Sequence, residues 1–540
     1  MALFSFQGGL RLKAYKRGST DLVVQAANIP KYLILPLQQH IGVPAKPVVE
    51  VGQRVFRGQL IASTGDKISA PVHASSSGTV VAIEPRPTPH ASGLDHMCIV
   101  IETDGLDQSR RREERCVYYK DLRVEEVRQA IANAGIVGMG GAGFPSFVKL
   151  SGEKPVETLI LNGAECEPYI TCDDMLMQEQ APAIFEGLEI MQYAVNAKHC
   201  IIAIENNKPI ALKRMRQALK NSGRKDIEVI NIPTVYPTGG EKQLIQTLTG
   251  KEVPSQGIPL DIGILCMNVG TAYAASHALY HGEPLISRYV TINGAVSKAR
   301  NLEVRLGTPM GDVIEQCGGN RKTLSKVIMG GPMMGVAMHS DMAPVIKTTN
   351  CIVATSVVSD VPLPSRDQIA LPCIRCGACI SVCPMGLLPH QLYWYSRAKD
   401  MDRVQDYHLF DCIECGCCDY VCPSQLPLVQ YFRFAKSTIW RQEREKRISD
   451  KSRERHEYHI FRLQREKAEK EARHKKKRDA LSASAKNPDL DKKQTLIQAA
   501  VERAKAKRET QNVKPKNTEN LTAEQQRMIE EVDKRRQERP

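Results

Sequence analysis

The feature that most constrains this chain is a run of four cysteines that occurs twice between residues 373 and 422. Both runs have the spacing C-x2-C-x2-C-x3-C followed by proline, and their members are Cys373, Cys376, Cys379 and Cys383, then Cys412, Cys415, Cys418 and Cys422. Three thiolates on one tight loop can bind three irons of a cubane cluster, so the fourth ligand must come from elsewhere. Gly377 and Gly416 are small where the backbone must close around inorganic sulfide. The spacing therefore predicts two [4Fe–4S] clusters.

The fourth ligand decides how the eight cysteines divide between the clusters. When this spacing occurs twice, the last cysteine of each run binds the cluster of the other run. One cluster is therefore expected to take Cys373, Cys376, Cys379 and Cys422. The other is expected to take Cys412, Cys415, Cys418 and Cys383. Cys417 is expected to be a packed thiol, and residues 387–409 have helical spacing, which favours a mostly helical domain.

Zinc and disulfides are the alternative interpretations of these cysteines. A structural zinc site uses four ligands in pairs and would leave the other four cysteines without a role. A disulfide framework belongs to short secreted chains, whereas this chain has 540 residues and 17 cysteines, most of the remainder scattered. Scattered free thiols indicate a reducing compartment, so we expect the cytoplasm. No apolar run reaches the roughly 18 residues of a membrane span, so any membrane association is expected to be peripheral.

Residues 31–100 contain short β-rich segments broken by glycine and proline, which predict a small β sandwich. Their order resembles the biotinyl/lipoyl barrel-sandwich hybrid, in whose carriers a hairpin lysine is modified. Here the hairpin is shortened to residues 64–67, so Lys67 is not expected to carry a group. His73, beside the hairpin, is expected to be a hydrogen-bonded structural histidine rather than a ligand.

Residues 115–275 show helices alternating with strands. Residues 124–131 have helical spacing, and buried strands are expected at 158–162 and 200–204. This alternation predicts an open α/β sheet. Ligands of such sheets lie beyond the carboxyl ends of the strands, so the loops there are the expected binding site.

A glycine-rich loop lies at residues 138–145, and its glycines are Gly138, Gly140, Gly141 and Gly143. Glycines let the backbone approach a ligand closely, and free N–H groups suit a phosphate. The spacing is not that of a Rossmann loop, because no clear strand precedes it and no acidic residue follows at the expected offset. On its own, an ordinary tight turn is an equal interpretation.

Three later segments, residues 162–168, 236–242 and 268–271, follow strands in the same way. With the glycine loop they resemble the FMN- and NADH-binding subunit of respiratory complex I. The resemblance implies bound FMN, with NAD(H) as substrate and no covalent catalytic residue. The residues that it assigns to the site are Gly138, Gly140, Gly141 and Gly143, near flavin and dinucleotide; Phe144 and Lys149, against NADH; Asn162 and Glu165, in the flavin pocket; Glu167, on the nicotinamide side; and Tyr236, Glu241 and Asn268, elsewhere in the pocket.

The chain departs from that pattern at three positions. Ala164 replaces an aspartate, Gly240 a glutamate and Met267 an asparagine. These changes remove polar groups expected near the isoalloxazine and ribityl chain. They keep open a second function, in which a non-catalytic iron–sulfur carrier or adaptor has lost its flavin.

Residues 285–345 resemble the small β-grasp module that follows the flavin domain in the complex I subunit, with a helix near 310–316. The complete order resembles the RnfC family, a subunit of the Rnf/Rsx ion-translocating electron-transport complex, over roughly residues 1–440, whereas the complex I protein lacks the second cysteine run. The fold class is therefore multidomain α/β. The expected domains are the barrel-sandwich hybrid front domain at 1–110, the FMN/NADH α/β domain at 111–280, the β-grasp module at 281–350, the helical two-cluster ferredoxin-like domain at 351–440 and a charged tail, helical or disordered, at 441–540.

The tail at residues 441–540 holds 30 Lys and Arg against 19 Asp and Glu, so it carries +11 of the chain's net charge of +14. Its composition predicts a solvated, partly disordered segment with stretches such as 496–507 that can form helix. Attraction to an anionic membrane surface is a secondary hypothesis. Nucleic acid is the weaker alternative, because aromatic residues for stacking are nearly absent.

The resemblance implies a peripheral subunit on the cytoplasmic face of the bacterial inner membrane. It would exchange electrons with NAD(H) through FMN and relay them over two [4Fe–4S] clusters to other subunits, including a ferredoxin-like one. Besides the flavin-free carrier, a further alternative is the flavin subunit of a soluble NAD-linked hydrogenase or formate dehydrogenase complex, although the lipoyl-like front domain does not fit it.

Overall fold

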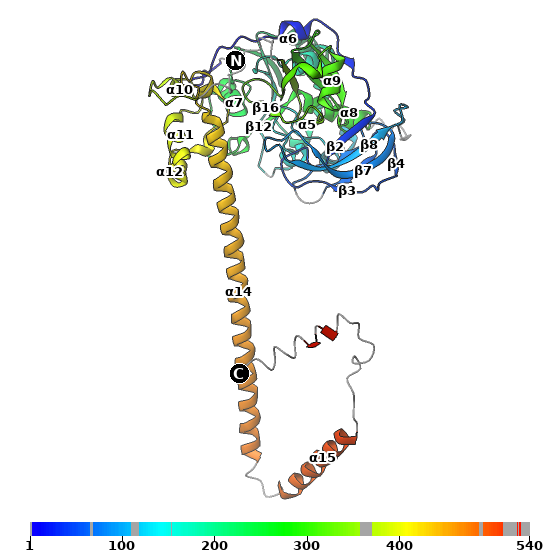
Figure 1. Ribbon diagram of the computed structural model, residues 1–540, viewed down its shortest axis with the longest axis vertical. Helices are drawn as coiled ribbons and strands as arrows, with labels where there is room; N and C mark the ends of the chain where they lie inside the picture. Colours follow the sequence, from blue (N-terminus) through cyan, green and yellow to red (C-terminus); the bar gives the residue numbers. More distant parts are fainter. Residues whose placement is uncertain are drawn as a thin grey trace. The chain divides into compact units, whose positions relative to one another are not determined.

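The structure is a computed structural model that describes residues 3–64, 68–109, 118–152, 154–356, 370–484, 490–510, 526–527 and 529–530. The chain divides into two units, Met1–Trp440 and Arg441–Pro540. The first unit contains four folded regions (Figure 1). They carry the predicted fold class, and both cysteine runs and the glycine loop belong to this unit.

The front region consists of two small antiparallel sheets. One sheet has the order β2–β8–β7–β4 and the other β3–β5–β6. Leu33 and Leu35 on one strand, and Ile99 and Ile101 on its neighbour, alternate toward the interior and are fully buried, as the period of a strand requires. Their bounds are β2 Tyr32–Pro36, β3 Lys46–Pro47, β4 Arg54–Val55, β5 Leu60–Ser63, β6 Val72–His73, β7 Gly78–Pro87 and β8 Asp95–Thr103.

The hairpin residue Lys67 lies outside the described residues. His73 is buried on β6, in register with Leu60 of β5.

The second region is a parallel four-stranded sheet of order β11–β10–β9–β12, covered by helices on both faces. Leu159 and Leu161 pack with α5 and α8, whereas Ile160 packs with α7 on the other face. Burial on both faces explains the continuous apolar strands of the sequence. The bounds are α2 Val124–Asn133, α3 Ser146–Leu150, β9 Thr158–Gly163, α4 Cys172–Glu179, α5 Ala181–Val195, β10 His199–Glu205, α6 Pro209–Ser222, β11 Ile227–Ile232, α7 Glu241–Thr249, β12 Ile264–Asn268 and α8 Val269–Tyr280.

The third region is a six-stranded sheet of order β1–β14–β13–β17–β15–β16, with the helix α9. The helix covers Met310–Gln316, where it was expected. Two strands come from outside the expected module: β1, Gln25–Ala26, pairs with β14, and β17, Cys351–Ser356, lies beside β13 in the middle of the sheet. The other bounds are β13 Ser287–Gly294, β14 Arg300–Arg305, β15 Leu324–Met329 and β16 Val336–Met338.

Residues 4–26 form what we call the N-terminal strap, which runs along three of the four regions. Its backbone bonds to α7 through Phe4 and Thr247 (2.9 Å) and to the cysteine-rich region through Gly9 and Val382 (3.0 Å). It ends as β1 in the β-grasp sheet. The sequence contains no pattern that announces these partners.

The cysteine-rich region is built from short helices, as predicted. Its core contains Leu392, Val404, Leu409 and Phe432, from α11, α12, a following turn and the first turns of α14. Figure 1 shows α10, α11 and α12 gathered beside the beginning of α14. The bounds are α10 Ala378–Ser381, α11 Pro389–Ala398, α12 Met401–Asp406, α13 Cys417–Tyr420 and α14 Leu428–Ser484.

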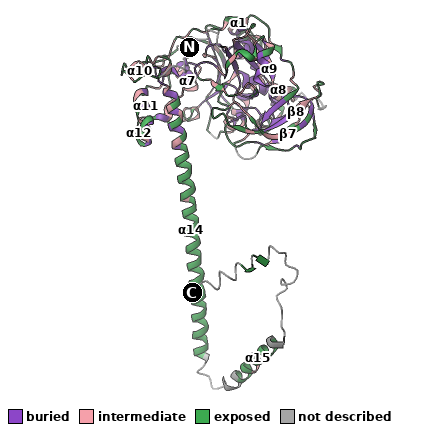
Figure 2. Ribbon diagram, viewed as in Figure 1, coloured by how far each residue is buried: buried purple, intermediate pink, exposed green. Residues whose placement is uncertain are grey.

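The second unit contains most of α14 and the helix α15, Leu490–Thr510. Figure 2 shows this part of α14 exposed along its length. Regular helix up to Ser484 exceeds the partly disordered tail that composition predicted. The reason is local: the segment contains no glycine or proline, and pairs such as Arg462–Glu466 (3.6 Å) lie one turn apart. Among the described helices, none is both long and apolar enough to span a membrane.

Candidate functional site

The eight cysteines of the two runs line two separate cavities. The first cavity, of about 440 Å³, is lined by three cysteines of the first run and the last of the second, which we call the first set: Cys373, Cys376, Cys379 and Cys422. The second is narrower, about 20 Å³, and is lined by the second set: Cys412, Cys415, Cys418 and Cys383. Four thiols around one cavity are the donor set that a [4Fe–4S] cluster requires, so the residues fit that group.

The two runs adopt the same local backbone. Gly377 and Gly416 have φ values of +76° and +77° and precede the short helices α10 and α13. Arg375 and Glu414, at the same place in each run, are also left-handed, with φ values of +56° and +58°. The repeated spacing therefore specifies a repeated loop in which glycine supplies the conformation that a side chain would oppose.

The surroundings of the two sets differ. In the first set, Cys376 is exposed, whereas Cys383, Cys415 and Cys418 of the second set are buried. Burial raises the pKa of the Cys412 thiol to about 12, and it raises the pKa of Cys418 well above its usual value. Such sulfurs keep their protons until a cation binds, so metal binding there must release protons.

Glu414 ties the second run to α14. Its carboxylate pairs with Arg433 (2.7 Å) and with Lys436 (2.9 Å). The nearly buried Lys436 ammonium also donates to the carbonyl of Cys412 (2.6 Å). A positive charge therefore lies directly against a ligand residue of the second set.

Cys417 is fully buried in a small cluster with Tyr236 and Met333. It also lines the second cavity, beside the second set. Its position is that of a packed thiol on the wall.

At the carboxyl ends of β9 and β12, the structure brings together part of the expected flavin pocket. Asn162 and Asn268 are register neighbours on these strands. Asn162 donates to the carbonyl of Gly239 (2.9 Å), and Asn268 caps α8 by accepting from Gly270 (2.8 Å). A Cβ built on Gly140 would lie 3.5 Å from Cβ of Asn268, so the glycine loop reaches the same place. We call this place the strand-end site.

The glycines of the loop serve different purposes. Gly141, at φ +114°, has nothing within 4 Å of a built Cβ, so it borders open space where a ligand can approach. Gly143, at φ +65°, would place a Cβ 2.7 Å from Thr348, so it is needed for packing. The loop closes through Gly138, which donates to the carbonyl of Phe144 (2.8 Å).

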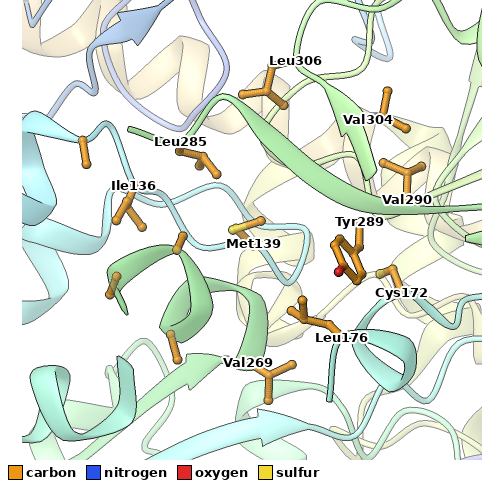
Figure 3. Packing of buried hydrophobic residues seen from close by; sticks show 14 of the residues in the cluster. Ile136, Met139, Cys172, Leu176, Val269, Leu285, Tyr289, Val290, Val304 and Leu306 are labelled. Atoms are coloured by element: carbon orange, nitrogen blue, oxygen red, sulfur yellow. The ribbon is translucent and has the colours of Figure 1, made fainter. Parts of the chain in front are cut away.

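Met139 anchors the same loop to the core. Its amide donates to the hydroxyl of Thr271 (3.0 Å), and its side chain is buried. Figure 3 shows Met139 among Ile136, Leu285 and Tyr289. The loop is therefore held at both faces while Gly140 and Gly141 stay exposed.

The two expected carboxylates are bound by the protein itself. Glu165, at φ +51°, accepts from the amide of Asp173 (2.7 Å) in the first turn of α4. Glu167 accepts from the amides of Met333 (2.7 Å) and Met334 (2.8 Å), in the loop after β15. Burial raises the pKa of both Glu165 and Glu167.

The remaining expected residues lie in two places. Lys149 pairs with Glu241 (2.7 Å) and donates to the carbonyl of Cys266 (3.1 Å) in β12, so both lie near the strand ends and are partly exposed. Tyr236 is buried, and its hydroxyl donates to the carbonyl of Cys415 (2.5 Å). Its hydroxyl thus reaches the second cysteine set.

At the three positions that depart from the complex I pattern, the structure explains what the replacements do. Ala164 and Met267 are buried in the two cores of the sheet, one on each face. Gly240 precedes α7, and a Cβ there would lie 2.7 Å from the side chain of Gln243. Apolar packing has therefore replaced polar groups at these points.

Sequence reasoning missed several polar residues near the strand-end site. Asp173 accepts from Asn268 (2.7 Å), and its place at the start of α4 was the only signal. Lys16 of the strap donates to the carbonyls of Glu165 and Ile170 (2.6 Å each), with no signal in the sequence. The pair Glu205–Lys208 (2.8 Å) is fully buried beneath Ala164.

Comparisons with protein families place these features in order. The matched models are the RnfC barrel sandwich hybrid domain at residues 4–106, the Nuo51 FMN-binding domain at 131–277, the SLBB domain at 289–337 and the 4Fe-4S dicluster domain at 372–426. The chain is thus of the class of flavin-domain proteins with a 4Fe-4S dicluster domain that serve electron transport.

Among curated proteins, it is 43% identical over 526 residues to the RnfC protein of the ion-translocating oxidoreductase complex of Pseudomonas aeruginosa, covering 94% of this chain and 66% of that protein. It is 44% identical over 507 residues to the equivalent protein of Serratia proteamaculans, covering 94% and 70%. The chain belongs to the RnfC family of ion-translocating oxidoreductase complexes, and it spans about two thirds of the length of these relatives.

A solved structure, NAD+-reducing [NiFe]-hydrogenase in the H2-reduced state, is similar to this chain with a TM-score of 0.43 and 18% identity. The similarity covers 57% of this chain and 61% of that one.

Proposed function

We propose that this chain is the NADH-linked electron entry module of a membrane-bound electron-transport complex. It takes electrons from NADH at FMN bound in the strand-end site and relays them over two [4Fe–4S] clusters. The observation that carries the proposal is the open space at Gly141, next to Asn162 and Asn268, in a unit that also holds two complete sets of four cysteines.

FMN, when bound, supplies the chemistry that converts a two-electron hydride transfer into single-electron steps. The protein supplies binding and orientation. Gly140 and Gly141 let the loop amides approach a phosphate. Asn162 and Asn268 offer amide groups at the strand ends, and the Lys149–Glu241 pair offers a cation and a carboxylate to the dinucleotide.

The two cysteine sets have different exposure, which suggests different roles in the relay. The second set contacts the flavin-binding domain through Tyr236. The first set includes the exposed Cys376 and lines an open cavity. We therefore assign electron entry to the second set and exit toward a partner, such as a ferredoxin-like subunit, to the first.

The assembly and its location follow from the family. The chain would act with other subunits of the complex on the cytoplasmic face of the inner membrane. The basic tail would add attraction to anionic lipid, on the order of 1 kcal/mol for each well-placed Lys or Arg.

A flavin-free carrier is the second candidate function. It is favoured by the buried Ala164 and Met267, and by the carboxylates of Glu165 and Glu167, which the protein's own amides already occupy. Flavin released by acid from the purified protein separates the two candidates, because only the entry module contains it.

The test of the entry module is NADH oxidation with an artificial acceptor by the reconstituted chain. Gly141→Arg is expected to abolish it, because the side chain would fill the open space at the loop. Gly52→Arg is the matched control, since Gly52 also has a positive φ (+89°) and nothing within 4 Å, but lies in the front region. Unchanged activity in Gly141→Arg would refute the site.

A further inference from the structure

Three segments that are distant in the sequence meet beside the second cysteine set. Gly9 of the strap donates to the carbonyl of Val382 (3.0 Å), next to Cys383. Leu10 and Tyr236 exchange two backbone hydrogen bonds (2.7 and 2.8 Å). The Tyr236 hydroxyl then donates to the carbonyl of Cys415.

The approach of these backbones is close enough to require glycine. A Cβ built on Gly8 would lie 2.7 Å from the carbonyl carbon of Val382 and 2.8 Å from the carbonyl oxygen of Cys383. A Cβ on Gly9 would lie 2.8 Å from the carbonyl oxygen of Tyr236. Both glycines have positive φ values, +71° and +79°. The strap is thus in direct backbone contact with a ligand residue and with the flavin-binding domain.

Side chains fill the same junction. Leu10 and Leu12 of the strap pack with Val382 and Ile413 on the buried cluster that contains Tyr236 and Cys417. The junction is therefore a small apolar core, shared by the strap, the flavin-binding domain and both cysteine runs.

We propose that residues 8–10 of the strap form a clasp with Tyr236 and the Val382–Cys383 loop, and that this clasp sets the position of the second cysteine set relative to the flavin-binding domain. Gly8 and Gly9 are then positioning residues for electron transfer inside the chain. The inference rests on the proposed function. One NADH gives up two electrons and a proton, and the two clusters together accept the two electrons, one each.

Other contacts hold the cysteine-rich region when the clasp is disturbed. Lys242 pairs with Asp411 (3.7 Å), the hydroxyl of Ser255 donates to the same carboxylate (2.5 Å), and Gln243 contacts Met385. A clasp variant is therefore expected to fold and keep its clusters. Because reaction rates are sensitive to displacements of about 1 Å, internal electron transfer should still slow.

The experiment compares Gly8→Ala with Gly105→Ala in the full reconstituted chain. The two glycines have the same φ of +71°, but a Cβ at Gly105 meets nothing within 4 Å, so this control carries the backbone strain without the clash. Iron and flavin contents, and NADH oxidation with an acceptor that takes electrons from flavin, are expected to be unchanged in both. Cluster reduction after rapid mixing with NADH is expected to slow at least about tenfold in Gly8→Ala alone.

Unchanged cluster reduction in Gly8→Ala, with full iron and flavin, overturns the clasp. If that variant loses iron, deletion of residues 3–8 decides, because the deletion removes the tie without adding a clash. Slow cluster reduction with full iron in the deletion supports the clasp. A wild-type rate overturns it, and so does loss of iron in both variants, since the strap would then hold the loop together rather than set its position.

A second readout does not depend on flavin. A spin label on Ile210→Cys, at an exposed position of α6, reports its distance to the reduced clusters by pulsed electron paramagnetic resonance. Gly8→Ala is expected to shift or broaden that distance, and Gly105→Ala is not. Wild-type protein without flavin would refute the proposed function, whereas an unchanged distance would refute the clasp.

Discussion

The two cysteine runs have the same spacing and the same loop backbone but different surroundings. Gly377 and Gly416 have nearly identical φ values, yet the first set borders an open cavity and the second is enclosed. At equivalent places the first run carries the exposed Arg375 and the second carries Glu414, which is paired with α14.

The difference teaches that ligand identity is local, whereas ligand environment is not. Spacing over eleven residues of each run specifies the loop. The groups that distinguish the sets, Tyr236 and Lys436, come from another domain and from a later helix. Identical ligands can therefore support clusters of different potential and different exposure.

The largest expected effect comes from removing one ligand of each set. Cys376→Ser and Cys418→Ser should each reduce the iron content from about eight to about four per chain. Cys418→Ser should also lower the melting temperature more, because its cluster is surrounded by the buried core. Iron analysis and thermal denaturation measure both effects. Equal melting temperatures in the two variants would remove the distinction between an open and an enclosed set.

The next effect concerns the rate of iron loss. A chelator or a mild oxidant should remove iron from the first set roughly tenfold faster, because the enclosed second set is reached only through local opening. The bleaching of cluster absorbance should then have two phases. In Cys376→Ser the fast phase should be absent. A single phase in the wild-type protein would contradict the comparison.

A smaller effect is expected from charges beside the clusters. Lys436→Met removes a nearly buried positive charge, so the reduction potential of the second-set cluster should fall by on the order of tens of millivolts. Arg375→Met, at an exposed position, should change the potential of the first-set cluster much less, because water and salt screen it. Redox titration of the two clusters measures the difference, and equal shifts would contradict it.

The smallest effect tests a buried cation away from both sets. The ammonium of Lys347 is fully buried and donates to the carbonyls of Pro71 and Gly135 (2.7 Å each). Burial lowers the pKa of Lys347 from 10.5 to about 7. Between these values the unfolded chain holds a proton that the folded chain lacks, so the free energy of unfolding rises with pH by up to about 1.4 kcal/mol per unit.

Lys347→Met should therefore lose this rise between pH 7 and pH 9, roughly the window set by the lowered pKa. Denaturation of wild-type and variant protein across that window measures it, with iron content as the control. The iron of both sets should be the same in the two proteins. A wild-type slope retained in the variant would show that other groups cause it.

Much of the scaffold could be predicted because its signals are local. The helix at Met310–Gln316, the parallel strands of the flavin-binding domain and the helical cysteine-rich region follow from periodicity and spacing. The long exposed helix α14 was underestimated, because composition indicates solvation but does not separate helix from disorder without reference to helix breakers.

The candidate site was only partly predictable. Gly141, Asn162 and Asn268 lie where strand ends and glycine chemistry suggest. The partners of Glu165 and Glu167 could not be foreseen, since the amides that bind them come from α4 and from the β-grasp loop.

The strap has a consequence for biosynthesis. A ribosome releases residues 4–16 long before it releases Thr247 and Val382, to which they bond. Contacts between segments so far apart form late, and apolar residues such as Leu10 wait uncovered in the meantime. Laying down the strap is therefore expected to be among the last events of maturation, after the domains that it fastens have been made.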